Sequence, residues 1–233
     1  MSRQPTGMPS GAAGAPPGPL FPVLTEAEAA LISYVDLPPR AMVVAQGAAA
    51  QTVRCLRAGW AFSFRTMADG RRQIVSLLLP GDTLGPEALI GLPVSCGIQA
   101  ITAVTIGAYP LAEMARLMHG NAAVRDHLLR VLVESLRERE ERIVALGARS
   151  ALRSVAALML DLHRRMLVLN LAGPDGFDCP LTQEMLADAL GITKVHVSRT
   201  LGALRRDGVL DLHGGRLTLH DPATLRRLAG MAA

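Results

Sequence analysis

The stretch that most constrains this chain is 181–210, LTQEMLADALGITKVHVSRTLGALRRDGVL, because its pattern predicts two short helices joined by a tight turn. The first helix is expected to begin near Gln183, and Gly191 stands where a left-handed residue would end it. Thr193 can cap the second helix with its side-chain oxygen. The expected buried stripe of the second helix is Val197, Leu201 and Leu204.

The outward face of the second helix has the chemistry of a nucleic-acid reader. Between Thr193 and Arg206 it carries four lysine or arginine residues and no acid, which suits a surface that approaches phosphates. A helix that projects its N-terminal half from a short turn also fits a DNA major groove. An ordinary helical hairpin with a solvated basic face is the alternative.

The residues after the helix pair favour the DNA-binding interpretation. Two short apolar runs within 209–219, VLDLHGGRLTL, flank His213, Gly214 and Gly215, and this pattern predicts a β-hairpin. A helix pair followed by a hairpin is a winged helix.

Composition limits the class of protein. With 233 residues, half of them hydrophobic, the chain is long enough for two modest domains, and its net charge of +4 is compatible with nucleic acid. No apolar run approaches the roughly 18–20 residues that span a bilayer and no signal pattern opens the chain, so a cytoplasmic protein without membrane contact is expected. The three cysteines are too far apart for a disulfide framework or a C-x-x-C metal site.

The N-terminal half is expected to be a β domain. Residues 1–20 are rich in Gly, Pro, Ala and Ser and predict a disordered arm, whereas 24–34 predicts a short helix capped by Thr25. Short apolar runs then predict antiparallel strands in a sandwich or jelly roll, with the clearest hairpin turn at Asp69 and Gly70. The expected strands lie within 42–45, 53–56, 61–64, 73–79 and 98–106.

A short helix over 110–118 and a long one over 122–146 are expected next. The long helix carries apolar residues at coiled-coil spacing, which predicts pairing with a second copy of the chain. The expected interface residues are Leu129, Leu132, Leu136, Ile143 and Leu146. Arg139 breaks one of the two series. A helix packed on its own β domain is the alternative, and Leu128, Val131 and Val133 favour it in part.

The helix is interrupted at 147–150, where a hinge is expected before another helix over 151–169. The predicted class is therefore α+β. The predicted organisation is a disordered arm over 1–20, a β-roll sensor domain over 21–120, a dimerisation helix and hinge over 121–148, and a winged helix-turn-helix domain over 149–233.

This order of parts resembles the Crp/Fnr family of bacterial transcription regulators over about residues 25–220. The resemblance is carried by Gly47, Gly59, Asp69, Gly70, the run LLPGDTLG over 78–85, the long helix, and GITKVHVSRTLGALRRDGVL over 191–210. It implies an antiparallel β-roll of the jelly-roll, cyclic-nucleotide-binding-like kind on a dimerisation helix, with a winged helix that reads a palindromic site. The implied partners are double-stranded DNA, a second copy of the chain and RNA polymerase.

The resemblance also assigns roles to single residues. Arg199 corresponds to an arginine that contacts guanine, and Ser198 to a position that supports base contacts. Val195 replaces the glutamate of many members, so a contact with a thymine methyl and an altered half-site are expected. Phosphate contacts are expected from Thr182, Thr193 and Arg216. The full predicted DNA-binding set is Thr182, Gln183, Thr193, Lys194, Val195, His196, Ser198, Arg199 and Arg216.

The sensor half departs from the family's ligand signatures. Cyclic-nucleotide binders carry Arg-Ser about ten residues after Gly-Glu, and this pair holds the cyclic phosphate through charge-assisted bonds. Here Gly85 is followed by Pro86 and Glu87, and 94–103 contains no arginine or lysine. Cyclic AMP and cyclic GMP are therefore expected to bind weakly or not at all. Residues 1–54 lack the cysteine cluster of the iron-sulfur members, and the effector stays unassigned.

The cysteines leave two further hypotheses. One Cys or His can suffice to hold haem, but the favoured interpretation of Cys55 and Cys96 is that they are buried or incidental cysteines. Cys179 would be a redox switch if it were exposed with a lowered pKa. The competing function is a signalling module, responsive to a small ligand or to redox state, whose helix pair contacts protein. No local motif of the chain assembles a catalytic site, so an enzyme is not expected.

Overall fold

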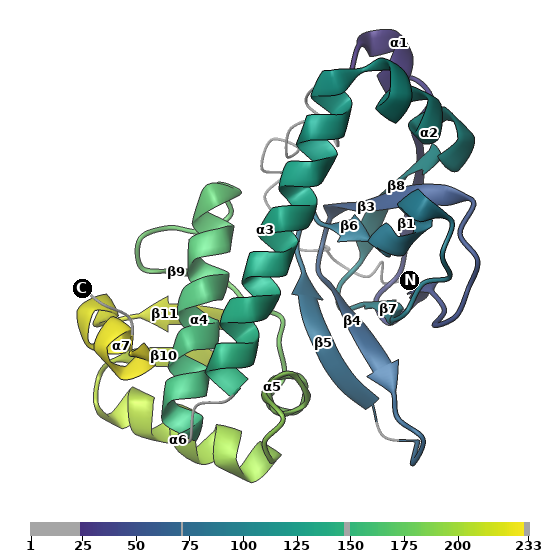
Figure 1. The fold of residues 1–233 in the computed structure, drawn as a ribbon. Coiled ribbons are helices and arrows are strands. Elements are labelled where there is room, and N and C mark those ends of the chain that lie inside the picture. The colour runs from purple at the N-terminus through teal and green to yellow at the C-terminus, as the bar shows by residue number, and fades with distance from the viewer. Residues whose placement is uncertain (1–23, 71, 147–149, 231–233) are drawn as a thin grey trace, which may run out of the picture.

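In the computed structural model of the chain, residues 24–70, 72–146 and 150–230 are described. They form a β-roll, a long helix and a winged helix-turn-helix in that order (Figure 1). Within the described ranges, no helix is long and apolar enough to cross a membrane.

The β-roll consists of two four-stranded antiparallel sheets, with strand orders β1-β8-β3-β6 and β2-β7-β4-β5. Apolar residues of both sheets, among them Leu56, Ala61, Ile98 and Ile106, fill its core. The strands are β1 (Ser33–Leu37), β2 (Met42–Val44), β3 (Thr52–Ala58), β4 (Ala61–Thr66), β5 (Arg72–Leu78), β6 (Thr83–Leu84), β7 (Gly97–Ala100) and β8 (Val104–Pro110). The predicted jelly-roll class is confirmed.

Two predicted extents in the β domain are wrong. The apolar run 98–106 is two strands, because the chain turns at 101–103, where the Thr102 hydroxyl accepts a hydrogen bond from the Trp60 amide at 2.9 Å. The predicted short helix with its Thr25 cap is present, but it covers only α1 (Glu26–Ala29) rather than 24–34, because the chain already enters β1 at Ser33, which pairs with Ala108 of β8. Hydrophobic periodicity alone did not show where these short apolar segments begin and end.

Helices α2 (Leu111–Gly120) and α3 (Ala122–Leu146) connect the roll to the C-terminal part, which begins with α4 (Ala151–Val168). The first turns of α3 bury Val124 and Leu128 against Tyr109 and Met114, which anchors the helix on the roll. The predicted hinge falls mainly on 147–149, outside the described residues, and Ser150 stands at the N-cap of α4 without a side-chain capping bond.

The C-terminal part is a winged helix-turn-helix built around α5 (Gln183–Leu190) and α6 (Lys194–Arg206). The predicted hairpin is β10 (Leu210–His213) and β11 (Arg216–Leu219), joined through Gly214 and Gly215. Its sheet has a third strand, β9 (Gly176–Asp178), where a loop was predicted. A β-carbon at Gly176 would overlap the Leu217 carbonyl, so glycine permits this close pairing. Helix α7 (Pro222–Ala229) was not predicted.

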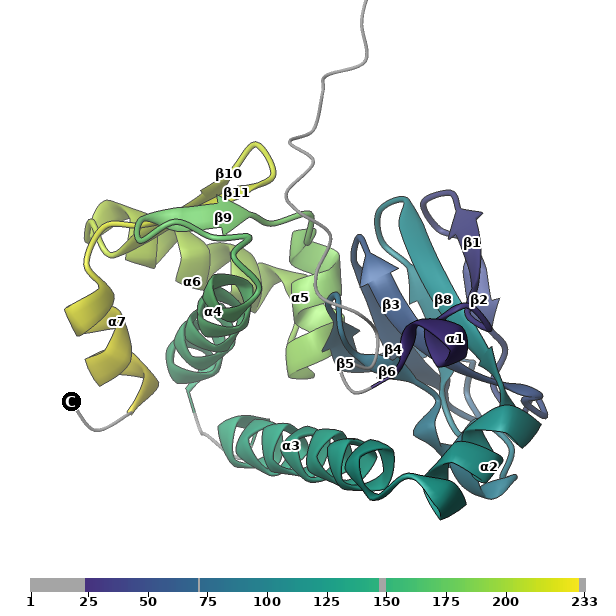
Figure 2. The same cartoon turned by 90° about the horizontal axis from the view of Figure 1, so that it is seen from above.

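The β-roll and the C-terminal part share one continuous hydrophobic cluster. It includes Phe62 and Leu77 of the roll together with Met159 of α4 and Leu186 of α5. Helix α5 lies beside β5 (Figure 2). At the edge of this contact the Trp60 and Phe177 rings stack with centroids 6.1 Å apart, and His163 of α4 stacks on Phe177 at 6.2 Å.

Candidate nucleic-acid interface and a cavity beside the long helix

Helix α6 is held as a projecting helix by the residues that the sequence pattern singled out. Gly191 adopts φ +65° and ends α5, and the Thr193 hydroxyl accepts a hydrogen bond from the His196 amide at 3.3 Å. Val197, Leu201 and Leu204 are buried in the cluster under the helix. The predicted helix pair, its turn and its buried stripe are therefore confirmed.

The opposite face of α6 is open to solvent. Its first two turns expose Lys194, Val195, His196, Ser198 and Arg199. Within the described part of the chain, no ion pair holds Arg199, so its guanidinium is available to an acceptor outside the protein. An isopropyl group at Val195 and a guanidinium at Arg199 can meet a thymine methyl and the acceptor edge of guanine.

Four predicted residues, Thr182, Thr193, His196 and Arg216, already have partners within the protein. The Thr182 hydroxyl caps α5 by accepting from the Met185 amide at 3.1 Å. The His196 ring lies 3.0 Å from the Thr193 hydroxyl. Arg216 in the wing forms an exposed ion pair with Asp178 at 3.1 Å. Gln183 is exposed at the first turn of α5, beside this surface.

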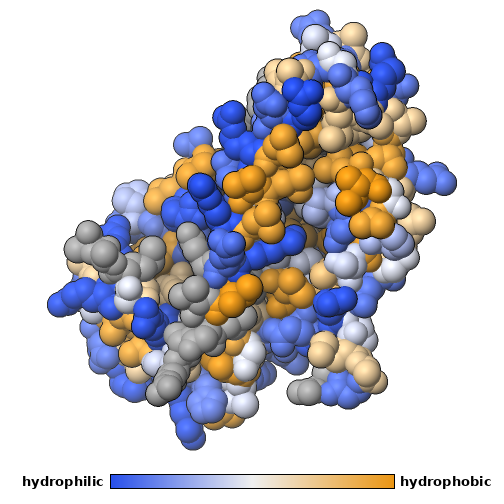
Figure 3. All heavy atoms as spheres, in the orientation of Figure 1, coloured by the Kyte–Doolittle hydropathy of each residue, from blue (hydrophilic) through white to orange (hydrophobic). Residues whose placement is uncertain are grey.

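The predicted dimer residues divide into two groups. Leu129, Leu136 and Ile143, which are seven residues apart, expose 54%, 56% and 68% of their surface, and hydrophobic side chains gather along α3 (Figure 3). Leu132 is half-buried and lines a cavity in the roll. The side chain of Leu146 lies outside the described part of the structure.

This cavity has a volume of about 230 Å³ and lies between the roll and the middle of α3. It is lined from the roll by β4, β5, the turn into β6, the 3-10 helix η1 (Pro86–Ile90) and the segment before β7. From α3 it receives Val131, Leu132, Glu134, Ser135 and Arg139. Arg139, which breaks the heptad pattern of α3, thus lines the cavity, and no local sequence signal indicated this role.

The lining does not suit a cyclic phosphate. Three of its described side chains are carboxylates, Asp82, Glu87 and Glu134, whereas one is a cation, Arg139, which is itself exposed to water. Of the three, Asp82 is ion-paired with Arg165. One carboxylate oxygen of Glu87 accepts from the Ser95 hydroxyl at 2.5 Å, and the other is buried with no hydrogen-bond partner among the described residues. An anion would therefore meet the uncompensated carboxylate of Glu87, whereas a ligand that donates hydrogen bonds would satisfy it.

The structure contradicts the redox hypothesis for Cys179. Its thiol is buried, and burial raises its pKa to about 11. Cys55 is buried too, with a pKa raised to about 12 by burial first and by Asp82 second. A thiol that stays protonated and inaccessible is a poor nucleophile. Cys96 is partly exposed at the cavity.

Comparison with known proteins bears on both halves of the chain. Residues 34–121 match the cyclic nucleotide-binding domain family, and residues 154–228 match the Crp-like helix-turn-helix domain family. The transcriptional activator protein FnrL of Cereibacter sphaeroides is 36% identical over 170 residues, which cover 71% of this chain and 68% of that protein. The nitrogen fixation regulation protein FixK of Bradyrhizobium diazoefficiens is 35% identical over 166 residues, 71% of this chain and 69% of that protein.

A solved structure is similar over both halves at once. The structure of FixK2 from Bradyrhizobium japonicum has a TM-score of 0.78 and 26% sequence identity, and the match covers 87% of this chain and 99% of that one.

Proposed function

Because the chain belongs to the Crp/Fnr family of bacterial transcription regulators, we propose that it is a homodimeric, sequence-specific regulator that reads a palindromic DNA site with α6. The observation that carries the proposal is the exposed first half of α6, held by the buried anchor Val197. Such a regulator acts through RNA polymerase at its promoters and functions in the cytoplasm.

Base reading is assigned to two side chains. Arg199 donates two parallel hydrogen bonds to O6 and N7 of a guanine, and Val195 packs on a thymine methyl. Ser198 supports the base contacts. The phosphates are surrounded by the other predicted residues, which are Lys194, His196, Thr182, Gln183, Thr193 and Arg216. Because Val195 cannot accept a hydrogen bond, the half-site differs at one base pair from that of members with glutamate there.

Dimerisation supplies the second reader. The exposed residues Leu129, Leu136 and Ile143 form a strip along α3 that a second copy would cover. A two-fold axis along this helix pair gives two copies of α6, which suit half-sites about one helical turn, roughly 34 Å, apart. The incomplete second heptad series is consistent with this arrangement, because Leu132 and Arg139 serve the cavity.

The proposal is tested by selecting duplexes from a random pool with the purified full-length protein. We expect a palindrome with a guanine in each half-site. Arg199→Ala should weaken binding to the selected site by about 10- to 100-fold and relax selectivity at that guanine. Arg206→Ala removes the same charge from the exposed last turn of α6 and should change binding only a few-fold.

Binding should also weaken steeply as salt rises, since it releases counterions. Equal losses for selected and scrambled duplexes in Arg199→Ala would remove the specific-reader assignment. Failure to select any sequence would favour a helix pair that contacts protein.

A further inference from the structure

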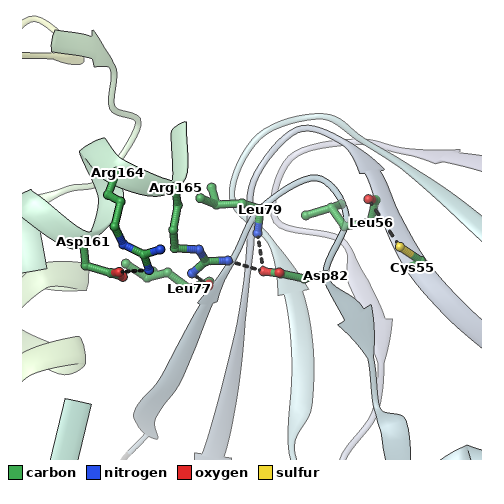
Figure 4. Close-up of polar contacts among 8 residues, drawn as sticks. All are labelled: Cys55, Leu56, Leu77, Leu79, Asp82, Asp161, Arg164 and Arg165. Atoms are coloured by element: carbon green, nitrogen blue, oxygen red, sulfur yellow. Dashed lines mark hydrogen bonds and ion pairs between the residues drawn. The ribbon is translucent and has the colours of Figure 1, made fainter. Parts of the chain in front are cut away.

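An ion pair joins the β-roll to the C-terminal part across their shared hydrophobic cluster, in addition to a hydrogen bond from the Gln73 side chain of β5 to the Asp188 carbonyl of α5. Arg165 of α4 donates from Nη2 to Asp82 Oδ2 at 2.6 Å and from Nη1 to the Leu77 carbonyl at 3.2 Å (Figure 4). The same Asp82 oxygen accepts from the Leu79 amide at 2.8 Å. Asp82 is therefore held by the turn before β6 on one side and by α4 on the other.

Burial makes this ion pair different from its neighbour on α4. The Arg165 and Asp82 side chains are 12% and 29% exposed. Arg164 pairs with Asp161 on its own helix at 2.9 Å, and those side chains are 58% and 34% exposed. Water screens the Arg164 pair strongly, so it is expected to contribute little, whereas the shielded Arg165 pair is a stronger, charge-assisted contact.

Asp82 also lines the cavity, beside Thr83, Gly85 and Glu87. Asp82 thus belongs both to the cavity wall and to the contact with α4. Helix α4 packs in the same core as α6, so a shift of α4 is transmitted to the DNA-reading helix.

Because Asp82 is shared in this way, we infer that Asp82 and Arg165 couple the cavity to the DNA-reading helix. A cavity ligand that carries a cationic or hydrogen-bond-donating group competes with Arg165 for Asp82 and loosens the C-terminal part. This inference rests on the proposed function for its DNA readout. Its chemical basis is the acidic lining of the cavity, which favours donors over anions.

The two states differ in what DNA they accept. With the bridge formed, the readers of a dimer keep one separation, and only half-sites at that spacing can bind both. With the bridge broken, each reader is mobile and has to be ordered when DNA binds. This ordering costs entropy, so affinity falls, and the spacing between half-sites matters less.

The coupling is tested with Asp82→Asn and Arg165→Met in the full-length protein. Asparagine keeps an acceptor for the Leu79 amide and removes only the charge. Each variant should bind the selected palindrome about tenfold more weakly, the scale of one charge-assisted hydrogen bond. Each should also discriminate less against a palindrome whose spacer is one base pair longer. The double variant should be no weaker than Arg165→Met alone, because Asp82→Asn acts through its contact with Arg165.

Hydrogen exchange gives a readout that needs no DNA. Amides of β5 and α5, which pack together, should exchange faster in both variants than in the unchanged protein. The control variants are Arg164→Met and Asp161→Asn, which remove the neighbouring, more exposed ion pair of α4. They should leave exchange, affinity and spacing selectivity unchanged.

The outcomes separate the two proposals. If the unchanged protein shows no sequence-specific binding, the proposed function fails. The exchange data then still show whether Asp82 and Arg165 hold the β-roll and the C-terminal part together. Multiplicative losses in the double variant, or unchanged exchange in both single variants, would overturn the coupling.

Discussion

Replacing Leu136 by alanine tests whether the exposed strip on α3 is a subunit interface. Leu136 lies in the middle of the strip, with Leu129 one heptad before it and Ile143 one heptad after it. The side chain does not support the β-roll core, so its truncation should weaken association more than folding.

The size of the effect follows from the exposed fraction of the side chain. Burying a whole leucine is worth about 1.5–3 kcal/mol, and 56% of Leu136 is exposed in one copy. Covering that remainder contributes about 1 kcal/mol per copy and about 2 kcal/mol per dimer. The dimer Kd should therefore rise by roughly 30-fold.

Sedimentation velocity over a dilution series measures this Kd, with circular dichroism as a check on folding. Arg137→Ala is the matched control, because Arg137 is exposed one residue further along the same helix and outside the heptad strip. The reasoning is refuted if Leu136→Ala dimerises as tightly as the unchanged protein, or if Arg137→Ala weakens the dimer equally.

Three further predictions concern the cavity, the thiols and α5. Calorimetry should detect no micromolar binding of cyclic AMP or cyclic GMP, because only one of the three carboxylates that line the cavity, Asp82, is paired with an arginine in the described structure; a micromolar Kd would contradict this. Brief treatment of the folded protein with iodoacetamide should modify Cys96 first, and early mass adducts on Cys55 or Cys179, both buried, would show that the β-roll or winged-helix core opens readily. Burial raises the pKa of the Asp188 carboxyl more than Arg72 lowers it. The ionised carboxylate therefore opposes folding at neutral pH, and its protonation stabilises the fold as pH falls through that raised pKa. Asp188→Asn should raise Tm at pH 7 by an amount that shrinks towards pH 4, whereas a lower Tm at pH 7 would contradict the sign.

The helix pair was predictable because its signals are local. A capping threonine, a left-handed glycine and an apolar stripe lie within fifteen residues of one another, and each has one structural meaning. The exposed heptad residues of α3 were predictable for the same reason. Strand β9 was missed because three residues next to a Gly-Pro-containing loop give no periodic signal, and its pairing with β11 is made some 40 residues away.

The cavity and the contact between the two parts could not be derived from local patterns. Arg139 looks like a defect in a heptad until the roll is placed against α3. Asp82 and Arg165 are separated by 83 residues, and each looks like an ordinary surface charge in its own segment. Only the packing of β5 against α4 and α5 brings them together.

The chain contains a single tryptophan, and the fold puts it where the β-roll meets the wing. Trp60 is 7% exposed and stacks on Phe177 of β9. Separation of the two parts would bring this indole into water, so its emission should move to longer wavelength. The protein thus carries its own fluorescent reporter, and no label is needed to follow in real time whether a compound in the cavity or a DNA duplex opens the molecule.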